Sequence, residues 1–173
     1  MYSNFFKNFI CSSIHLCINY NTIFVYRCFQ CLKYVKITKK EILKMCVFCS
    51  IIKGELPSNI VYQDDTVIAI LDIAQATKGH TLVIPKKHYE NIYDIDEETL
   101  KHMIVVSKRL SAQIVNKMHA DGLNIVNNNG DAAGQAVKHI HFHLLPRYNG
   151  DDYVLKGTEH NYDLKEILKQ IQD

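Results

Sequence analysis

The sequence predicts an α+β domain with a mainly antiparallel sheet and one long helix. Short runs of apolar and β-branched residues between positions 60 and 84 are separated by turn-forming residues, which favours neighbouring strands. The segment Glu97–His119 has the apolar spacing of one amphipathic helix. The segment His139–Leu145 alternates histidines with apolar residues, a period of two that is typical of a strand with one buried face. In a chain of 173 residues, these elements suit one globular domain with an extension.

Turn signals separate the expected elements along the chain. Gly54 and Pro57 end a first short helix, the Asp64-Asp65 turn separates two strands, and Pro85 ends a third strand. In chain order we expect a helix at Ser50–Lys53, strands at Ile60–Tyr62, Val67–Leu71 and Gly79–Ile84, the helix Glu97–His119, strands at Leu123–Val126 and Lys138–Pro146, and a terminal helix at Leu164–Ile171.

The long helix carries the clearest local signals. Asp96 suits the N-cap position, and Glu97 and Glu98 place negative charge at the positive end of the helix. The apolar residues recur three, four or six positions apart and predict one buried stripe, formed by Leu100, Met103, Ile104, Leu110, Ile114 and Met118. We therefore interpret both methionines as core residues rather than metal ligands.

Residues 1–45 differ in composition from the rest of the chain. They carry seven basic residues against the single acidic Glu41, a net charge of +6, which leaves −4 for residues 46–173 of a chain whose total charge is +2. A basic, acid-poor N-terminus is typical of an organelle-targeting segment. The alternatives are a disordered extension, or an upstream stretch wrongly joined to the coding sequence, because Met45 directly precedes the first motif.

These interpretations set the expected domain boundaries and location. We expect an N-terminal extension at 1–45, a folded domain at 46–150, and a tail with a short helix at 151–173. The protein would be cytoplasmic or nuclear if translation starts at Met45, and organellar if residues 1–45 are a targeting segment. A mildly acidic domain without a stripe of Lys or Arg does not fit a nucleic-acid binder. The sequence also lacks an apolar run of about 18 residues, the length that would predict a membrane span. We therefore expect neither nucleic acid nor a membrane as a partner.

The alternating histidine segment is the strongest functional signal. If its apolar residues face the core, His139, His141 and His143 lie side by side on the opposite face of the strand. Imidazole can be a nucleophile, a general acid or base, and a metal ligand near neutral pH. A solvated face that happens to contain histidines is the alternative, but three histidines in register favour a site.

The loop Asn128–Gln135 leads directly into this segment. Its small residues, including Gly134, let backbone amides approach an anion closely, and Asn128 and Gln135 add side-chain donors. Asn-Gly stretches are mostly ordinary turns. Because this one precedes three histidines, we predict a phosphate site within reach of an imidazole.

The cysteines suggest a metal site with two possible ligand sets. Cys46 and Cys49 form a C-x-x-C pair, which needs two further ligands to close a tetrahedral zinc site. Cys28 and Cys31 lie at a spacing close to that of zinc ribbons, and spacing alone slightly favours this pair. The other candidates are two histidines of the domain, drawn from His80, His88 and His139. A pair of buried thiols without metal is the remaining alternative.

Several motifs between Cys46 and about Tyr148 occur in the order typical of one known family. They are Cys46-x-x-Cys49, Ile51–Pro57, Leu71-Asp72-Ile73, Gly79–His88, Gly134–His143 and Pro146-Arg147-Tyr148. In these motifs the chain resembles the histidine-triad (HIT) superfamily, and within it the bacterial-type Hint branch of nucleotide-binding phosphoramidases. The resemblance implies the HIT fold, with a five-stranded sheet, and a homodimer in which two such sheets become continuous.

The resemblance also implies catalytic roles. His141, the middle histidine of the triad, would attack the α-phosphorus and form a nucleotidyl-histidine intermediate. His143 would contact the phosphate and assist the leaving group, and His80 matches a fourth histidine near the site. Gln135, together with backbone amides, would stabilise charge on the phosphate oxygens.

Binding roles follow from the same resemblance. Asp72 would bind the ribose hydroxyls of a purine nucleotide, and Asn128, Gly134 and Gln135 would lie on the phosphate side. The base would lie in an apolar slot formed by Phe48, Ile51, Leu56 and Ile70. A structural zinc ion would be held by Cys46, Cys49, His88 and His139, which selects the histidine ligands over Cys28 and Cys31.

The implied function is a hydrolase, a purine nucleoside phosphoramidase that cleaves the P–N bond of adenosine 5′-phosphoramidates. The alternatives are a dinucleoside polyphosphate hydrolase of the Fhit type, which uses the same triad, and a nucleotide-binding scaffold with weak catalysis. One residue departs from the pattern, because many Hint proteins have serine or threonine at the position of Ala136. The missing hydroxyl removes one phosphate donor, so we expect reduced turnover.

Overall fold

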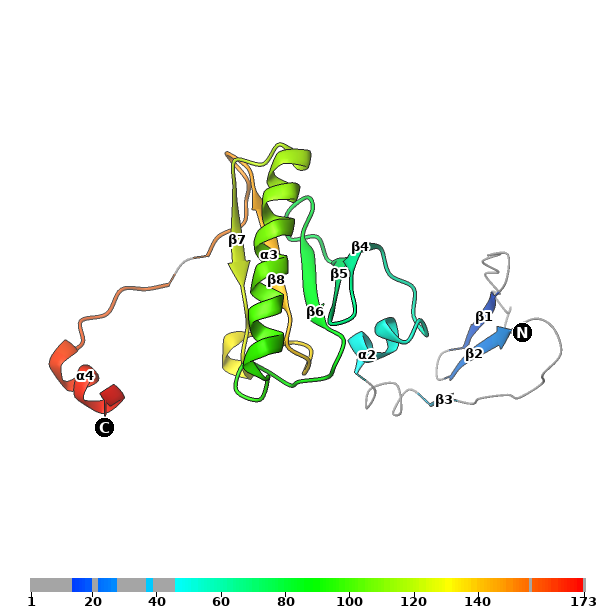
Figure 1. Ribbon diagram of the computed structural model, residues 1–173, viewed down its shortest axis with the longest axis horizontal. Helices are drawn as coiled ribbons and strands as arrows, with labels where there is room; N and C mark the ends of the chain where they lie inside the picture. Colours follow the sequence, from blue (N-terminus) through cyan, green and yellow to red (C-terminus); the bar gives the residue numbers. More distant parts are fainter. Residues whose placement is uncertain (1–13, 20–21, 28–36, 39–45, 156, 173) are drawn as a thin grey trace, which may run out of the picture.

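The computed structural model describes residues 46–155 and 157–172 with their side chains, and the backbone of residues 14–19, 22–27 and 37–38 (Figure 1). These backbone segments form β1 (Ile14–Asn19), β2 (Thr22–Arg27) and β3 (Ile37–Thr38), an antiparallel sheet that shares no strand with the main sheet. These three strands were not among the expected elements, although the run is rich in the β-branched and aromatic residues that favour strands. Most of the expected extension, with Cys28 and Cys31, lies outside the described residues.

The main sheet has five antiparallel strands in the order β4-β5-β6-β8-β7, which confirms the predicted fold class. Its strands are β4 (Ile60–Gln63), β5 (Val67–Leu71), β6 (Thr81–Pro85), β7 (Gly122–Val126) and β8 (Phe142–Arg147). β4, β5 and β6 follow one another as neighbours, whereas β8, the last strand in the chain, lies between β6 and β7. This insertion puts the end of the histidine segment on an interior strand of the sheet.

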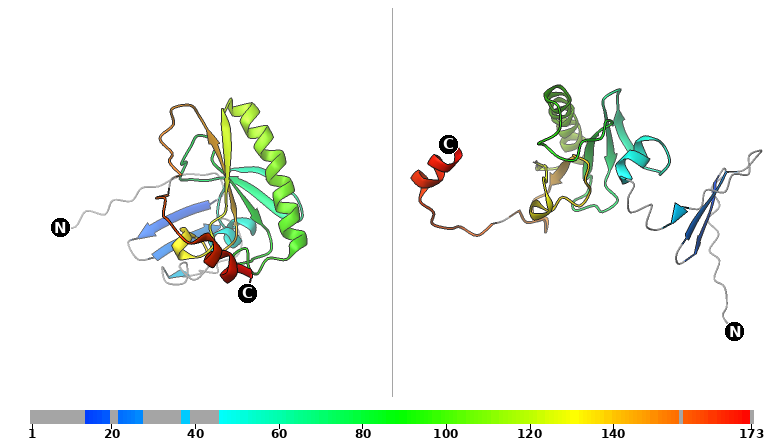
Figure 2. Two further views of the ribbon diagram at one scale, coloured as in Figure 1. Left: turned by 90° about the vertical axis from the view of Figure 1, so that its left-hand side faces the viewer. Right: turned by 90° about the horizontal axis from the view of Figure 1, so that it is seen from below.

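One face of the sheet is covered by α3 (Glu97–Met118), as two further views show (Figure 2). Asp96 is its N-cap and accepts a hydrogen bond from the Thr99 backbone amide, as predicted. The core between α3 and the sheet contains Val67, Ala69, Val83, Met103, Val106, Leu110, Ile114, Ile140, Phe142 and Leu144. The prediction that Ile104 belongs to this buried stripe is wrong, because Ile104 is 46% exposed. The buried side is centred on Met103 and Ser107, and one residue step of about 100° turns Ile104 away from it.

On the opposite face of the sheet, α2 (Val47–Ile52) covers part of β5 and β6, and it begins three residues earlier than the predicted helix. Phe48 from this helix packs with Ile68, Ile70, Leu82 and Ile84 of the strands in a second, smaller core. The sheet is therefore covered on both faces at β5 and β6, and the histidines lie on the α2 face.

The predicted strand Lys138–Pro146 is wrong at its start, because β8 begins only at Phe142. Before that point the backbone bonds to groups outside the ladder: the Ile140 amide donates to the Tyr89 carbonyl at 2.8 Å, and the His141 carbonyl accepts from Asn127 Nδ2 at 2.9 Å. The predicted alternation nevertheless holds, because Ile140, Phe142 and Leu144 all pack in the core under α3.

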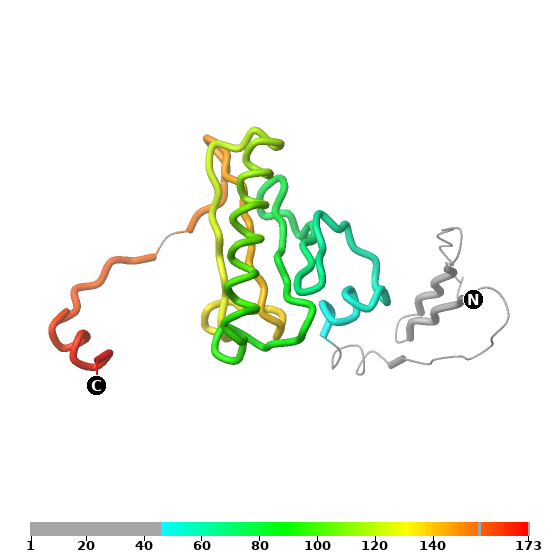
Figure 3. The backbone as a smooth tube through the Cα atoms, viewed as in Figure 1, coloured from blue at the N-terminus to red at the C-terminus, as the bar shows by residue number. Residues whose placement is uncertain are grey.

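The chain ends with an extended segment and α4 (Leu164–Gln172), which confirms the predicted terminal helix. The backbone trace shows this helix standing away from the sheet (Figure 3). Three of its four apolar residues are exposed, with Leu164 and Ile171 each 76% accessible. No helix in the described part of the chain is both long enough and apolar enough to cross a membrane.

Candidate active site and metal site

The three histidines of the alternating segment form a row on the α2 face of the sheet. The ring centroids of His141 and His143 are 4.7 Å apart, and the ring of Phe48 meets His141 edge-on at 5.0 Å. His139 and His141 are almost fully buried, whereas His143 is partly exposed. The row therefore runs from a buried end at His139 to an open end at His143.

The hydrogen bonds of His141 define its reactive atom. Its Nδ1 lies 2.8 Å from the backbone carbonyl of His139, which can only accept, so we assign the proton to Nδ1. The lone pair is then on Nε2. Burial lowers the pKa of His141, so the ring is neutral near pH 7. A neutral imidazole with a free Nε2 lone pair is the form that acts as a nucleophile.

His143 is linked to two further polar side chains. Its Nδ1 lies 2.9 Å from His80 Nε2, and His80 Nδ1 lies 3.2 Å from the Ala74 carbonyl and 3.6 Å from Asp72 Oδ2. Because the carbonyl can only accept, we assign the proton of His80 to Nδ1, and its Nε2 then accepts from His143 Nδ1. The outward Nε2 of His143 is thus free to exchange a proton. Burial, and then the nearby His141 and His80, lower the pKa of His143 to about 4.

The loop before the histidines is held by the predicted Gln135, which is buried. Its Oε1 accepts from the Gly130 amide at 2.8 Å, and its Nε2 donates to the carbonyls of Glu90 at 2.6 Å and Val137 at 3.1 Å. Both amide hydrogens are therefore used inside the loop. In this arrangement Gln135 holds the loop, and it would have to release one carbonyl before donating to a phosphate. Gly134 adopts a positive φ of 78°, which glycine allows without strain.

One supporting residue was missed in the sequence. Asn127 Nδ2 donates to the His141 carbonyl, and Asn129 Nδ2 donates to Asn127 Oδ1 at 2.6 Å. The three consecutive asparagines are a signal for this role, because alternation along an extended segment puts Asn127 and Asn129 on one side and Asn128 on the other. Asn128 lines a cavity with His80 and His143.

The predicted apolar slot is partly assembled. Phe48 and Ile70 are buried in the smaller core, and Ile51 packs against that core. Leu56 is not a member of it and is 43% exposed. Phe48 therefore forms the link between this apolar cluster and the row of histidines.

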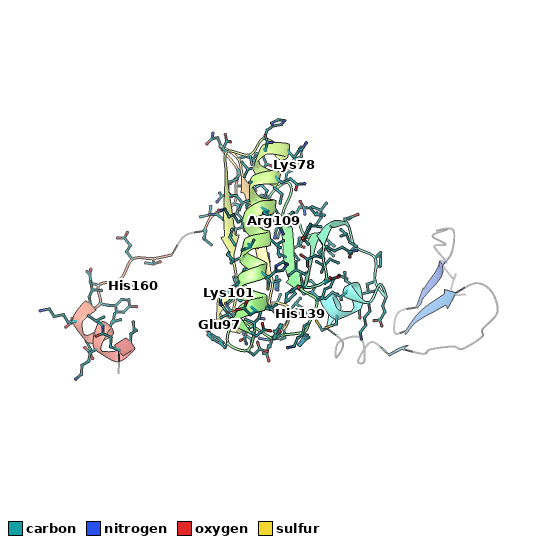
Figure 4. The ribbon with its side chains drawn as sticks, viewed as in Figure 1. Lys78, Glu97, Lys101, Arg109, His139 and His160 are labelled. Carbon is teal, nitrogen blue, oxygen red and sulfur yellow. The ribbon has the colours of Figure 1, made fainter. Side chains whose placement is uncertain are left out.

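Four predicted metal ligands converge at the buried end of the row. The nitrogen and sulfur atoms of Cys46, Cys49, His88 and His139 all lie within 4.8 Å of one another. His139 Nδ1 is 3.3 Å from Cys46 Sγ and 3.6 Å from Cys49 Sγ, and His88 Nδ1 is 3.3 Å from Cys49 Sγ. In a tetrahedral zinc site such sulfur–nitrogen edges are about 3.5 Å long. Figure 4 shows His139 beside α2, which carries Cys49.

The surroundings of this cluster also suit a metal. His139 Nε2 lies 2.9 Å from the Pro85 carbonyl, so it carries the proton and leaves Nδ1 free to coordinate. Burial, followed by the hydrogen bond and charge of Cys46, raises the pKa of the Cys49 thiol to about 11. A bound cation would reverse this effect because it stabilises the thiolate.

Comparison with known proteins gives consistent matches. The model of the HIT domain family matches residues 53–150. An uncharacterized HIT-like protein of Methanocaldococcus jannaschii is 50% identical over 129 residues, which cover 74% of this chain and 99% of that protein. The crystal structure of a Zn-bound histidine triad family protein of Mycobacterium smegmatis shares 39% identity with a TM-score of 0.62, covering 75% of this chain and 96% of that one. A hypothetical histidine triad nucleotide-binding protein of Sulfolobus tokodaii shares 42% identity with a TM-score of 0.60, covering 73% and 87%.

Proposed function

This chain belongs to the HIT domain family, and from that premise we propose that it is a Hint-type nucleotide-binding hydrolase that cleaves the P–N bond of purine nucleoside 5′-phosphoramidates. The observation that carries the proposal is the pairing of His141, whose Nε2 is free, with the adjacent His143, whose Nε2 can exchange a proton. A nucleophile beside a proton donor is what a two-step displacement at phosphorus requires.

In the first step His141 Nε2 attacks the α-phosphorus. A bond forms between Nε2 and phosphorus, and the bond between phosphorus and the amine nitrogen breaks. The electron pair of that bond goes to the amine nitrogen, which takes a proton from His143 Nε2. His143 is neutral in the free site, but the negative charge of a bound phosphate favours its protonated form. The His80 ring, held by the Ala74 carbonyl, keeps His143 oriented.

In the second step water attacks the phosphorus of the nucleotidyl-histidine. The oxygen–phosphorus bond forms, the bond to His141 Nε2 breaks, and a water proton passes to His143. This proton restores the donor for the next cycle, and the product is a nucleoside monophosphate. The same histidine therefore acts first as an acid and then as a base.

The other predicted residues would bind the nucleotide. Asp72, beside His80, would accept hydrogen bonds from the ribose hydroxyls. The base would lie against the cluster of Phe48, Ile51, Leu56 and Ile70, and the phosphate would lie near Asn128, Gly134 and Gln135. The similarity to the hypothetical nucleotide-binding protein of Sulfolobus tokodaii supports this part of the proposal.

The cluster of Cys46, Cys49, His88 and His139 would hold zinc in a structural role. Four protein ligands close the coordination sphere, so the ion would supply stability and not chemistry. It would connect α2 to the start of the histidine row. The Zn-bound relative from Mycobacterium smegmatis supports the choice of metal.

A homodimer is also part of the proposal. β7 is an edge strand of the described main sheet and pairs only with β8 there, so its other side can pair with a second copy. Ile125 on β7 and Val105 on α3 are 44% and 52% exposed. Pairing of two β7 strands would cover such residues and join two sheets.

The test measures AMP release from adenosine 5′-phosphoramidate and, in parallel, from diadenosine triphosphate. We expect AMP release from the phosphoramidate. We expect this release to be lost in His141→Ala and kept in His160→Ala. His160 is a matched control because it lies in the exposed tail (Figure 4). Preference for the dinucleotide would assign the Fhit-type activity instead. AMP binding without His141-dependent release from either substrate would assign a nucleotide-binding scaffold.

A further inference from the structure

The segment between β6 and α3 includes a loop at residues 88–94, the supporting loop, which contacts the phosphate loop at residues 128–135. The Glu90 carbonyl accepts a hydrogen bond from Gln135 Nε2 at 2.6 Å. Gln135 is buried, and its Oε1 accepts from the Gly130 amide, so this side chain closes the phosphate loop on itself. The supporting loop therefore holds the residue that sets the shape of the phosphate loop.

One carboxylate holds the Glu90 end of the supporting loop. Asp94 Oδ2 accepts from the Glu90 amide and Asp94 Oδ1 accepts from the Asn91 amide, both at 2.9 Å. The Asn91 N–H and the Glu90 carbonyl belong to one planar peptide group, and in a trans peptide they point in opposite directions. Asp94 on one side and Gln135 on the other therefore hold the same peptide group. Because the Asn91 and Glu90 amides lower the pKa of Asp94, these bonds are charge-assisted near neutral pH, which is the stronger class of hydrogen bond.

A second anchor holds the supporting loop independently of Asp94. The Ile92 amide donates to Asn129 Oδ1 at 2.8 Å. Because a backbone N–H can only donate, this bond fixes the orientation of the Asn129 amide group, whose Nδ2 then donates to Asn127 Oδ1 at 2.6 Å. With this anchor intact, removal of the Asp94 carboxylate is expected to release the Glu90 peptide group while the supporting loop stays in place.

We propose that Asp94 is a positioning residue for the phosphate site, because it orients the peptide group that holds Gln135 in the phosphate loop. The inference rests on the proposed nucleotide binding. Asp94 is exposed, so it adds nothing to the hydrophobic core, and it is not one of the four residues of the metal cluster. Its removal is therefore expected to weaken the binding of the phosphate and to leave the binding of the nucleoside and of the metal unchanged.

The test compares the binding of AMP and of adenosine to the full-length chain by calorimetry. The two ligands differ only by the phosphate, so the ratio of their Kd values reports the phosphate site alone. The wild type is expected to bind AMP about tenfold or more tightly than adenosine, as a single hydrogen bond to a charged group would give. In Asp94→Ala the Kd for AMP is expected to rise about tenfold, the loss of one such bond, and the Kd for adenosine to stay within about twofold. Asp94→Asn, which keeps one acceptor oxygen, is expected to lie between.

Two further variants show whether Asp94 acts through the contacts described. Asp121→Asn is the matched control, because the Asp121 carboxylate accepts from the Asn149 amide at 2.8 Å in a different turn, and it is expected to keep the wild-type ratio. Gln135→Ala is expected to lower the ratio. Combined with Asp94→Ala, its effect is expected to be smaller than the product of the two single effects, because both substitutions release the same contact. A full product would show that Asp94 does not act through Gln135 and would reject the proposal.

The outcomes separate this inference from the proposed hydrolysis, because neither AMP nor adenosine contains a P–N bond. If no phosphoramidate is cleaved but the ratio falls in Asp94→Ala, the hydrolase function fails and the positioning role stands. If phosphoramidate is cleaved and the ratio is unchanged in Asp94→Ala, the function stands and the positioning role fails. An equal rise of both Kd values, or a loss of zinc from the variant relative to the wild type, would show a general structural role and overturn the proposal. A wild type with no preference for AMP over adenosine would overturn it as well.

Discussion

At the scale of single residues, the two histidines of the proposed mechanism are assigned different roles because their hydrogen bonds differ. His141 is fixed by a carbonyl oxygen and presents a lone pair, whereas His143 is bonded to another imidazole and can pass a proton. On the proposed mechanism, the first residue is needed for every substrate that reacts through the histidine intermediate. The second is needed only when the departing group must be protonated.

This difference predicts a substrate-dependent effect of His143→Ala. With adenosine 5′-phosphoramidate, kcat is expected to fall by about 10²–10⁴, the usual contribution of a general acid. With the p-nitrophenyl ester of AMP the fall is expected to be much smaller, because p-nitrophenolate leaves without a proton. Steady-state assays of both substrates check this, with His141→Ala inactive on both. An equal loss on the two substrates would contradict the role of His143 as acid.

At position 136 we predict the opposite effect, a gain of activity when alanine is replaced by serine. Ala136 is exposed in the loop that leads to the histidines. A hydroxyl there can donate to the phosphate, and the loss of one such donor typically costs about a hundredfold or more in rate. Ala136→Ser is therefore expected to raise kcat by about tenfold or more, with little change in the melting temperature. If single-turnover rates of the variant and the wild type agree, the missing hydroxyl does not limit this site.

At the scale of secondary structure, Asp64 joins the β4–β5 turn to α3. It accepts hydrogen bonds from Tyr62 Oη at 2.7 Å, from His102 Nε2 at 2.8 Å, and from the backbone amides of Thr66 and Val67. Burial by itself raises the pKa of this carboxyl, but the hydrogen bonds from Tyr62, Val67, His102 and Thr66 together hold it below its usual value. His102, which looks ordinary in the sequence, thereby connects the helix to the turn.

The lowered pKa predicts how this connection depends on pH. A carboxyl whose pKa is lower when folded than when unfolded adds stability above the unfolded value of about 3.9, and that stability is lost as the pH falls below it. Asp64→Asn is therefore expected to cost about 1–3 kcal/mol in urea unfolding at pH 7, and clearly less at pH 3. Asp65→Asn, at the exposed neighbour, is the control. A constant cost of Asp64→Asn across this range would exclude the charged form as the cause.

Sequence periodicity predicted every α-helix and strand of the described domain and placed the histidines on one face. It failed where hydrogen bonds from distant segments decide the structure. The late start of β8 depends on the Tyr89 carbonyl and on Asn127, which no local pattern reveals. For the same reason the sequence suggested Gln135 as a free donor, whereas its amide is bonded to the carbonyls of Glu90 and Val137. Tyr153 lines the cavity beside His80 and His143 although it belongs to no motif, because only the fold of the tail brings it there.

At the scale of the whole molecule, the cluster of Cys46, Cys49, His88 and His139 predicts that the stability of the fold depends on zinc. It joins α2, the segment after β6 and the start of the histidine row. The protein is expected to contain one zinc ion per chain by elemental analysis, and chelation is expected to lower its melting temperature by several degrees, as loss of a few kcal/mol would. Cys49→Ser is expected to have the lower melting temperature already, and not to respond to chelator. A zinc-free wild type with the same melting temperature as the variant would contradict a structural site.

The position of β8 between β6 and β7 has a consequence for biosynthesis. β6 and β7 pair through a strand that follows both of them in the chain, and Leu82 and His143, which face each other across β6 and β8, are 61 positions apart. Until residues 142–147 have left the ribosome, β6 and β7 each lack a neighbour, and unpaired strands of this kind are prone to aggregate. Contacts over such distances also form slowly. The strand that completes the sheet carries His143 and directly follows His141. On the proposed mechanism, a partly synthesised chain therefore lacks the catalytic pair, and the fold and the activity would arise together.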